Sequence, residues 1–443
     1  MSGTLTVKTL SDILAISPNI CYSGVSTTLT QMRLVQKHII DKHHGFYAEC
    51  ARLCFLSKNL FNYANYLIRQ SFIFEAKYLN YNAMVKLCQG TADYTALPAK
   101  VSQQTLMRLH ESWISFFEAS KKYANCPQKF LGRPKLPQYK HKTDGRFVVT
   151  YTSQAVSQQW LTKGVVHLSQ TDIFLTTRVR EIQQVRIVPL PFHYAIEVVY
   201  EAIAQTQQGN EENIAGIDIG LNNLAALSSN VLGLTPLIIN GRPLKALNAY
   251  YNKKKAQLQS QLKREQQTSN RIKQLTHKRN CKVDNYLHNA SRLIINHLAA
   301  NHIGTLVIGK NDGWKQEINI GKRNNQNFVS IPHARFIEML KYKACLAGIK
   351  VVITEESYTS KCSFLDFEPM SKQQRYKGRR IKRGLFRASD GQLINADMNG
   401  SLNIIRKAFG NEAFASDSIQ DLVVSPVRVT PYNIDPGFRG RSP

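Results

Sequence analysis

The chain has 443 residues, 43% of them hydrophobic, which is enough to bury more than one core and predicts several domains. Its 58 Lys and Arg residues outnumber 30 Asp and Glu residues, and the formal net charge of +28 indicates a polyanionic partner. No apolar run is long enough to span a membrane, and the N-terminus has no basic segment followed by an apolar one, so we expect a cytoplasmic protein without a membrane partner.

The positive charge is spread over three runs. Lys121–Arg146 holds eight basic residues and one acid, and Lys253–Arg279 holds nine and one. In Arg375–Arg387, seven of thirteen residues are basic and none is acidic. A single run is also typical of a solvated helix face. Three runs in a chain with 19 Tyr and 19 Phe favour nucleic acid over a membrane surface.

The eight cysteines stand at scattered spacings, without any CxxC pair. This argues against a disulfide framework and against a zinc site. We therefore expect all eight to be reduced.

Taken in chain order, residues 1–28 are rich in Ser and Thr and predict a variable N-terminal extension. Residues 29–44 are expected to supply the first strand of a small β-barrel, which short alternating runs in residues 128–205 complete. Between them, residues 45–127 have helical spacing and predict a helical domain. Two faces are expected there, one with Leu56, Leu60, Tyr63 and Leu67, the other with Leu106, Leu109, Trp113, Phe116 and Phe117.

A polar linker, Gln205–Asn213, precedes the candidate catalytic domain. This domain is expected to comprise residues 213–360 and 392–410, which are rich in strand patterns at both ends and helical between them. Residues 361–391 form a basic insertion. The last segment, 411–443, contains four prolines and little periodicity, and we expect a flexible tail.

Three acidic elements carry the candidate chemistry. Asp218 lies between Ile217 and Ile219, in the first strand of a hairpin that turns at Gly220. A charge in that setting is costly unless it is paired or binds a cation, although a structural Asp at a turn is the simpler alternative.

Asp397 opens a helix whose predicted apolar face contains Leu402, Ile405 and Phe409. Asn395 or Asp397 could equally be only a helix cap. The third element is the strand Ile349–Ile353, which ends in the adjacent carboxylates Glu355 and Glu356. Together, the three elements could hold two divalent ions for phosphodiester hydrolysis, and Mg²⁺ suits such hard oxygen ligands.

The segments around these acids resemble a known family. GIDIGLNNLAAL and NADMNGSLNIIRK resemble the first and third RuvC motifs of the TnpB (OrfB) proteins of insertion sequences, relatives of the type V CRISPR effectors. The stretch Asp284–Asn311 resembles the helix and strand between those motifs. LFNYANYLIRQSFI, LPAKVSQQTL, FLGRPKLPQYKHK and GLFRASDGQLINAD are similar to further segments, so the resemblance covers about residues 30–410.

The resemblance implies an α/β multidomain fold with an RNase H-like (RuvC) nuclease domain, a wedge β-barrel and a helical recognition domain. It implies an RNA-guided DNA endonuclease encoded by an insertion sequence. The partners would be a guide RNA transcribed from the transposon end and double-stranded target DNA beside a short motif that the protein reads. Asp218 and Asp397 would be catalytic, metal-binding carboxylates, with Mg²⁺ as the cofactor and Mn²⁺ as a substitute.

One departure from the family concerns the third carboxylate. The family's second-motif Glu is replaced by Gly309 in TLVIGKN. Glu355 or Glu356 could supply the missing ligand from the next strand, and Asp312 is a weaker substitute. In an extended chain consecutive side chains point to opposite faces, so one glutamate alone can face the Asp pair. We favour Glu356, which shares the parity of Val352. The alternative functions are a nuclease-inactive, RNA-guided DNA-binding protein and a small type V CRISPR effector.

A second departure concerns zinc. The family commonly has a four-Cys zinc ribbon before the third motif, but here Cys362 stands alone, so zinc is not expected. The basic run is predicted to replace the ribbon as a nucleic-acid contact through Arg379, Arg380, Lys382 and Arg383.

Further nucleic-acid contacts are predicted in the first half of the chain. In LPAKVSQQ, the donors and acceptors of Lys100, Gln103 and Gln104 suit base edges, although a plain helix start is the alternative. In GRPKLPQYK, the predicted contacts are Arg133, Lys135 and Lys140. Tyr63, Tyr66 and Trp113 could stack on bases or lie in a core. The sequence does not predict an oligomeric state.

Overall fold

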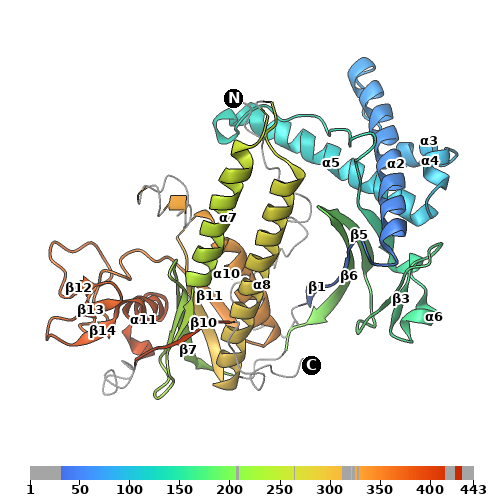
Figure 1. Cartoon of the computed structure of the whole chain (residues 1–443). Helices are drawn as coiled ribbons and strands as arrows, with labels where there is room; N and C mark the ends of the chain where they lie inside the picture. The colour runs from blue at the N-terminus through green and yellow to red at the C-terminus, as the bar shows by residue number, and fades with distance from the viewer. Residues whose placement is uncertain are drawn as a thin grey trace. The chain divides into compact units, whose positions relative to one another are not determined.

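The computed structural model describes residues 31–205, 209–263, 265–311, 321, 325–326, 329–414 and 425–431. The chain divides into two compact units, one ending at Ala202 and the other beginning at Ile203 (Figure 1). The predicted N-terminal extension of residues 1–28 lies outside the described residues.

The first unit combines a helical part with two small sheets. Its elements are β1 (Gln31–Ile40), α2 (Tyr47–Phe74), α3 (Tyr81–Cys88), α4 (Ala92–Thr95), α5 (Ala99–Asn125), β2 (Val149–Thr152), α6 (Gln158–Leu161), β3 (Val165–His167), β4 (Phe174–Thr176), β5 (Gln184–Leu190) and β6 (His193–Ile203). The larger sheet has the order β1-β6-β5-β2, and β3 pairs with β4 alone. The predicted strands are present, but closure into a barrel is not confirmed, because β1 and β2 lie at opposite edges of this sheet.

Apolar residues at helical spacing hold α2 and α5 together, as the sequence predicts. Leu60, Leu106, Leu109 and Trp113 are fully buried in one core. The indole Nε1 of Trp113 donates a 3.0 Å hydrogen bond to Asn65 Oδ1, which satisfies the polar group that burial would otherwise leave unpaired.

The second unit is built on a six-stranded sheet. Its elements are β7 (Asn210–Ile219), β8 (Asn223–Ser229), β9 (Leu237–Asn240), α7 (Arg242–Ser260), α8 (Asn270–Ala300), β10 (Ile303–Gly309), α10 (His333–Leu346), β11 (Lys350–Thr354), β12 (Arg379–Lys382), β13 (Leu385–Arg387), β14 (Leu393–Asn395), α11 (Ala396–Phe409) and β15 (Val427–Val429). The strand order is β11-β10-β7-β8-β9-β15. Strands β7, β8 and β9 are antiparallel neighbours, whereas β10 runs parallel to β7 and β11 parallel to β10.

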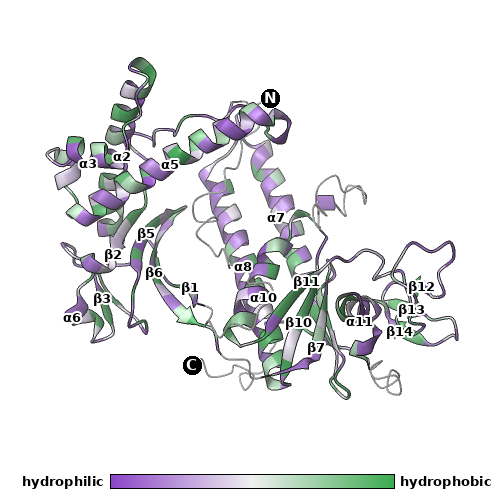
Figure 2. Cartoon of the chain, turned by 180° about the vertical axis from the view of Figure 1, so that it is seen from behind, coloured by the Kyte–Doolittle hydropathy of each residue, from purple (hydrophilic) through white to green (hydrophobic). Residues whose placement is uncertain are grey.

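Alternate residues of β7 face different cores. Ala215, Ile217 and Ile219 pack into the core with α8 and α10, and Ile214 packs into the core with α11. Strand β10 is buried along its whole length and hydrophobic in Figure 2, as expected for a parallel strand covered on both faces, whereas α7 is mostly hydrophilic. The helix α11 therefore covers the face of the sheet toward which Asp218 projects.

The predicted basic insertion at residues 361–391 lies in a folded segment, Cys362–Asn395, which packs against this unit. Strands β12, β13 and β14 form an antiparallel sheet. Phe364 and Phe386 are buried in the same core as Leu402 and Ile405 of α11. These aromatic residues anchor the segment to α11.

Three further expectations need correction. Residues Asn210–Asn213, predicted to be linker, begin β7. Val427–Val429, predicted to lie in the tail, form β15 and pair in parallel with β9, because β-branched residues suit a sheet edge. Phe409, predicted on the apolar face of α11, is 38% exposed since the helix ends there. In the described part of the chain, no helix is long and apolar enough to cross a membrane.

Candidate functional site

Asp218 lies near the carboxyl end of β7, opposite Ala226 of β8. Its carboxylate points to α11, and a Cβ added to Gly400 of that helix would lie 2.7 Å from Asp218 Oδ2. Gly400 thus leaves the space that the carboxylate needs. The side chain of Asp218 is half-buried beneath this helix.

Two glycines that the sequence analysis did not single out permit this close packing. A Cβ at Gly216, two residues before Asp218, would lie 2.7 Å from Ile405 Cγ1 of α11. Gly216 and Gly400 together bring β7 and α11 to a backbone separation that larger residues would prevent. The spacing of Gly216 from Asp218 is the signal that could have indicated it, since both face the same side of the strand.

Asp397 lies in the first turn of α11. The N-cap is Asn395, whose side chain accepts hydrogen bonds from the backbone N–H groups of Asp397 and Met398. Asp397 is therefore not the cap, and its carboxylate is available for other contacts. Asn223 Nδ2 donates to Asp397 Oδ2 at 2.5 Å, and Arg380 Nη2 lies 3.7 Å from Asp397 Oδ1.

Glu356 fills the space above Gly309. A Cβ at Gly309 would lie 2.5 Å from Glu356 Cγ and 2.6 Å from Glu356 Oε1. Strand β11 ends at Thr354, but the parity argument holds, because Val352 and Glu356 both face the α11 side of the sheet. The backbone N–H of Glu356 donates to Asn311 Oδ1 at 2.9 Å.

Glu355 points away from the acidic pair. Its side chain is 65% exposed, and its Oε2 accepts a 3.4 Å contact from Lys407 Nζ. The Glu356 carboxyl group is close enough to Asp218 for the charge of Asp218 to raise its pKa. The weaker candidate, Asp312, lies outside the described residues.

Asp218 and Glu356 have too little positive charge nearby to balance their negative charge. Burial, together with the charge of Asp397, raises the pKa of Asp218 to about 7, and Arg380 opposes this shift. Burial also raises the pKa of Glu356 to about 8, with the charge of Asp218 adding to the effect. Glu356 Oε1 is buried and has no hydrogen-bond partner among the described residues.

As the side chains stand, no group of three or more His, Cys, Asp or Glu residues in the described ranges converges tightly enough to hold a metal ion. Asp397 Oδ1 instead faces the guanidinium of Arg380. A divalent cation fits the chemistry of the site, because it would supply the positive charge that Asp218 and Glu356 lack and a partner for the orphaned Glu356 oxygen.

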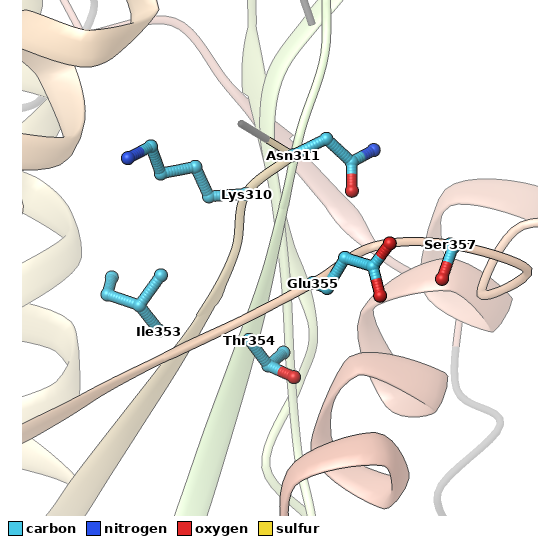
Figure 3. A pocket seen from close by; sticks show the side chains of 6 residues that line it. All are labelled: Lys310, Asn311, Ile353, Thr354, Glu355 and Ser357. Carbon is cyan, nitrogen blue, oxygen red and sulfur yellow. The ribbon is translucent and has the colours of Figure 1, made fainter. Parts of the chain in front are cut away.

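A cavity of about 580 Å³ opens beside this cluster, at the carboxyl ends of β10 and β11. Figure 3 shows its lining, which is Lys310, Asn311, Ile353, Thr354, Glu355 and Ser357. Glu355 borders this cavity, while the next residue, Glu356, faces Gly309 and the acidic pair. The Lys310 side chain points away from Glu355 (Figure 3).

The predicted nucleic-acid residues divide into exposed and packed side chains. Arg379, Lys382 and Arg383 are exposed on β12 and the turn after it, as are Lys100, Arg133 and Lys135 in the first unit. Gln103 and Gln104 are half-buried in α5, the helix start that the alternative interpretation predicts. Arg380 is exposed but paired with Asp397.

Lys140 differs from the exposed residues because its ammonium lies over two aromatic rings, and its contact with nucleic acid stays a prediction. Its Nζ is 5.1 Å from the ring centre of Phe61 and 5.5 Å from that of Phe147, and burial lowers its pKa. The backbone of Lys140 exchanges two 2.8 Å hydrogen bonds with the side chain of Asn62. These contacts fasten the segment to α2, so Lys140 has a structural role.

Among the aromatic residues proposed for stacking, Trp113 is fully buried, Tyr63 is packed against the same core and Tyr66 is 49% exposed. The seven cysteines in the described residues are free thiols, and Cys21 lies outside them.

Comparison with known proteins shows which families this chain resembles. The family model OrfB_IS605, described as a probable transposase, matches residues 193–315. The model of the Cas12f1-like TNB domain matches residues 333–404, which include β11, the three-stranded sheet and the first turns of α11. Both matches fall almost entirely on the second unit.

Relatives of the chain extend the match. A TnpB-like protein, ORF457 of Acidianus two-tailed virus, is 24% identical over 81% of this chain and 83% of its own length. The CRISPR-associated endodeoxyribonuclease Cas12f2 of a Micrarchaeota archaeon is 27% identical over 50% of this chain, which spans 41% of that longer protein.

Solved structures similar to this chain include a Cas12f1–sgRNA–target DNA complex, with 14% identity, a TM-score of 0.34, and coverage of 84% of this chain and 98% of that one. The mini-RNA-guided endonuclease CRISPR-Cas_phi3 has 10% identity, a TM-score of 0.41, and coverage of 85% and 92%. By these family models and relatives, the chain is similar to transposase-associated OrfB_IS605 proteins and to Cas12f-type proteins. The chain is a TnpB-like relative of the type V effectors.

Proposed function

We propose that this protein is an RNA-guided, metal-dependent DNA endonuclease with an RNase H-like (RuvC) catalytic domain. The observation that carries the proposal is the place of Glu356, whose carboxyl group occupies the space above Gly309 and adjoins Asp218. Asp218, Glu356 and Asp397 then give the set of three acidic residues that the sequence motifs alone leave incomplete.

The carboxylates of Asp218, Glu356 and Asp397 would hold Mg²⁺, or Mn²⁺ as a substitute. Bound divalent cations supply activation of water and stabilisation of the leaving oxygen in phosphodiester hydrolysis. Asn223 orients Asp397 through its hydrogen bond to Oδ2. Arg380, half exposed beside Asp397, is placed to exchange this carboxylate for a phosphate oxygen of the substrate.

The proposed partners are a guide RNA transcribed from the transposon end and double-stranded DNA with a short adjacent motif. The net charge of +28 and the exposed basic residues of both units support a nucleic-acid partner. One similar structure is a complex with guide RNA and target DNA, and one relative is named an endodeoxyribonuclease. Target choice would follow from base pairing, with the protein holding the backbone.

The test is cleavage of a matched plasmid by the complex purified with its co-purifying RNA, which sequencing identifies. We expect cleavage with Mg²⁺ or Mn²⁺. Asp218→Asn, Glu356→Gln and Asp397→Asn should each lose cutting while RNA-dependent DNA binding is kept, and Glu355→Gln should cut as the parent does. A Glu356→Gln variant that cuts normally would reject the proposed third carboxylate.

The second candidate function is an RNA-guided DNA-binding protein that no longer cuts. The ion pair between Arg380 and Asp397 favours it, since the guanidinium provides positive charge to Asp397 without a metal. If the parent complex binds matched DNA but never cuts it with Mg²⁺ or Mn²⁺, this function replaces the first.

A further inference from the structure

Helix α11 carries a stripe of polar residues that bind one neighbouring segment. Asn399, Asn403 and Lys407 stand four residues apart, so they lie on one face of the helix. Their side chains all bond to residues between Glu355 and Phe364, the stretch that follows β11. This stretch contains Glu356 and forms no strand or helix of its own.

The two asparagines fix the far end of the segment. Asn399 accepts a 2.8 Å hydrogen bond from the Phe364 N–H and donates one of 2.9 Å to the carbonyl of Cys362. Asn403 donates to the carbonyls of Thr359 and Cys362, at 3.0 Å and 2.8 Å. Both amides are fully buried, so these bonds are formed where water cannot replace them.

Lys407 fixes the near end. Its Nζ lies 2.8 Å from Ser357 Oγ, 3.0 Å from the Ser357 carbonyl and 3.4 Å from Glu355 Oε2. The three N–H donors of the ammonium thus match three acceptors, on the residues immediately before and after Glu356. The Lys407 side chain is only 20% exposed, which protects these contacts from water.

The backbone of Glu356 itself is held from the opposite side by Asn311, through the 2.9 Å bond from its N–H. The Glu356 carboxyl group nevertheless faces Asp218, a group of like charge. Its Oε1 has no hydrogen-bond partner among the described residues, so no bond of its own side chain fixes the carboxyl group above Gly309. The contacts of Lys407 with Glu355 and Ser357 restrain the backbone on both sides of Glu356 instead.

We propose that Lys407 is a positioning residue, which holds the Glu355–Ser357 backbone so that the carboxyl group of Glu356 stays above Gly309 and beside Asp218. The inference rests on the proposed function and deepens it. Lys407 is not needed to anchor α11, because Leu402 and Ile405 bury the helix in the core and Arg406 bonds to Asn403, Asn411 and the Glu368 carbonyl. Its contacts therefore serve the segment that carries the carboxylate.

The test compares Lys407→Met with Lys361→Met. Lys361 lies in the same segment but is exposed, so its replacement removes one positive charge without touching the Glu355–Ser357 contacts. Hydrogen exchange of the peptide covering residues 355–361, measured on the purified protein without metal, should be faster in Lys407→Met than in the parent and Lys361→Met. This readout does not depend on activity.

In the guide-RNA complex, Lys407→Met should slow single-turnover DNA cleavage by about tenfold or more, as expected when a reacting group is displaced by about an ångström. DNA affinity should match that of Lys361→Met. Lys407→Arg should restore part of the rate, because arginine can reach the same acceptors. Ser357→Ala, which removes one acceptor and leaves the charge, should give a smaller loss and covers the case in which Lys407→Met fails to fold.

The outcomes separate this inference from the proposed function. If Glu356→Gln cuts normally, the proposed carboxylate set is wrong and the inference falls with it. If Glu356→Gln is inactive while Lys407→Met and Ser357→Ala keep parental exchange or parental cleavage, the site stands and the positioning role is overturned. Faster exchange with slower cleavage, together with rescue by arginine, supports it.

Discussion

A side chain at position 309 would occupy the same volume as the side chain of Glu356. This overlap explains why Glu356, which follows the neighbouring strand β11, is the acidic residue at this place. A Cβ at Gly309 would lie 2.5 Å from Glu356 Cγ and 2.7 Å from Ile404 Cδ1. Neither neighbour has room to move without disturbing the core or the carboxyl group. We therefore expect Gly309→Ala to displace Glu356 and to slow DNA cleavage by about tenfold or more, with guide-RNA binding unchanged in a filter-binding assay.

The reciprocal exchange tests the same volume. Gly309→Glu alone should be inactive and less stable, because two glutamate side chains cannot share the space. Adding Glu356→Gly removes the clash and places a carboxyl group at the position that the resemblance to the family predicts. The double variant should cut faster than Gly309→Glu. Equal inactivity of both would show that the backbone at Gly309 cannot present a carboxylate to Asp218.

The raised pKa values of Asp218 and Glu356 predict a pH dependence of stability in the metal-free protein. Both folded pKa values, about 7 and about 8, exceed their ordinary values of 3.8 and 4.5, so folding takes up protons between about pH 4 and pH 8. The two groups therefore contribute stability at low pH that is lost as the pH rises through 8. The slope is at most about 1.4 kcal/mol per pH unit for each group.

Chemical denaturation in EDTA at pH 5, 6, 7 and 8 measures this slope. Asp218→Asn and Glu356→Gln should each flatten it and should stabilise the metal-free protein at pH 8. Mn²⁺ should raise the melting temperature of the parent more at pH 8 than at pH 6, because the cation binds deprotonated carboxylates. A parent whose pH profile coincides with that of Asp218→Asn would remove the argument for uncompensated charge.

Helix α10 contains a second buried charge, on the face of the sheet opposite α11. Lys343 is 4% exposed, and its Nζ donates to the His288 carbonyl at 2.8 Å and to Ser291 Oγ at 2.7 Å. Burial, with a smaller contribution from Arg292, lowers its pKa to about 7 from 10.5. The unfolded chain then holds more protons between pH 7 and 10.5, so this group makes stability rise with pH over that window.

Lys343→Met should remove that rise, so the unfolding free energy of the variant relative to the parent should fall between pH 7 and pH 9. Urea denaturation at these two pH values gives the measurement. Lys350→Met is the matched control, since Lys350 is 58% exposed at the start of β11. Identical pH profiles for the two variants would contradict a titrating Lys343.

At the level of elements, the sequence pattern predicted the strand and helix positions of the candidate acidic residues, while their role as a catalytic site stays a prediction. Period-two alternation placed Asp218 in a strand, and strand parity selected Glu356 over Glu355. Local patterns could not reveal that Gly216 and Gly400 set the distance between β7 and α11, because the contact joins residues far apart in the chain. The Asn399–Asn403–Lys407 stripe was equally hidden, since polar residues at helical spacing are typical of solvent-facing surfaces.

For the whole molecule, the change in composition near residue 205 predicted the division into two units, which falls between Ala202 and Ile203. The pairing of β15 with β9 was missed, because parallel pairing between residues 237 and 427 depends on long-range contacts that proline content obscures. The order and coverage of the second unit's sheet also follow from tertiary packing. A single sequence therefore could not predict which face of the sheet each of α8, α10 and α11 covers.

The exposed basic strand β12 allows the last prediction. Arg379, Lys382 and Arg383 are exposed on the edge of a three-stranded sheet, where charged residues also serve to prevent pairing with another chain. If they contact phosphates instead, each contact contributes about −0.9 to the slope of log affinity against log salt for duplex, and about −0.7 for single strands. Arg380 is left unchanged, because its loss would also expose Asp397 to uncompensated repulsion.

The triple variant Arg379→Gln, Lys382→Gln, Arg383→Gln should therefore flatten the salt dependence of DNA or RNA binding by roughly two to three. Fluorescence anisotropy between about 50 mM and 300 mM salt measures it, with separate guide-RNA and matched-duplex probes. A matched triple variant of Lys253, Lys254 and Lys263, which are exposed residues of the second basic run, controls for the loss of net charge. Counterion release depends only on contacted phosphates, so both slopes stay at the parental value if β12 contacts no phosphate.

A reduced slope for one probe alone identifies which nucleic acid lies against β12. Equal slopes for parent and variant on both probes would show that the basic residues of β12 serve to prevent pairing with another chain.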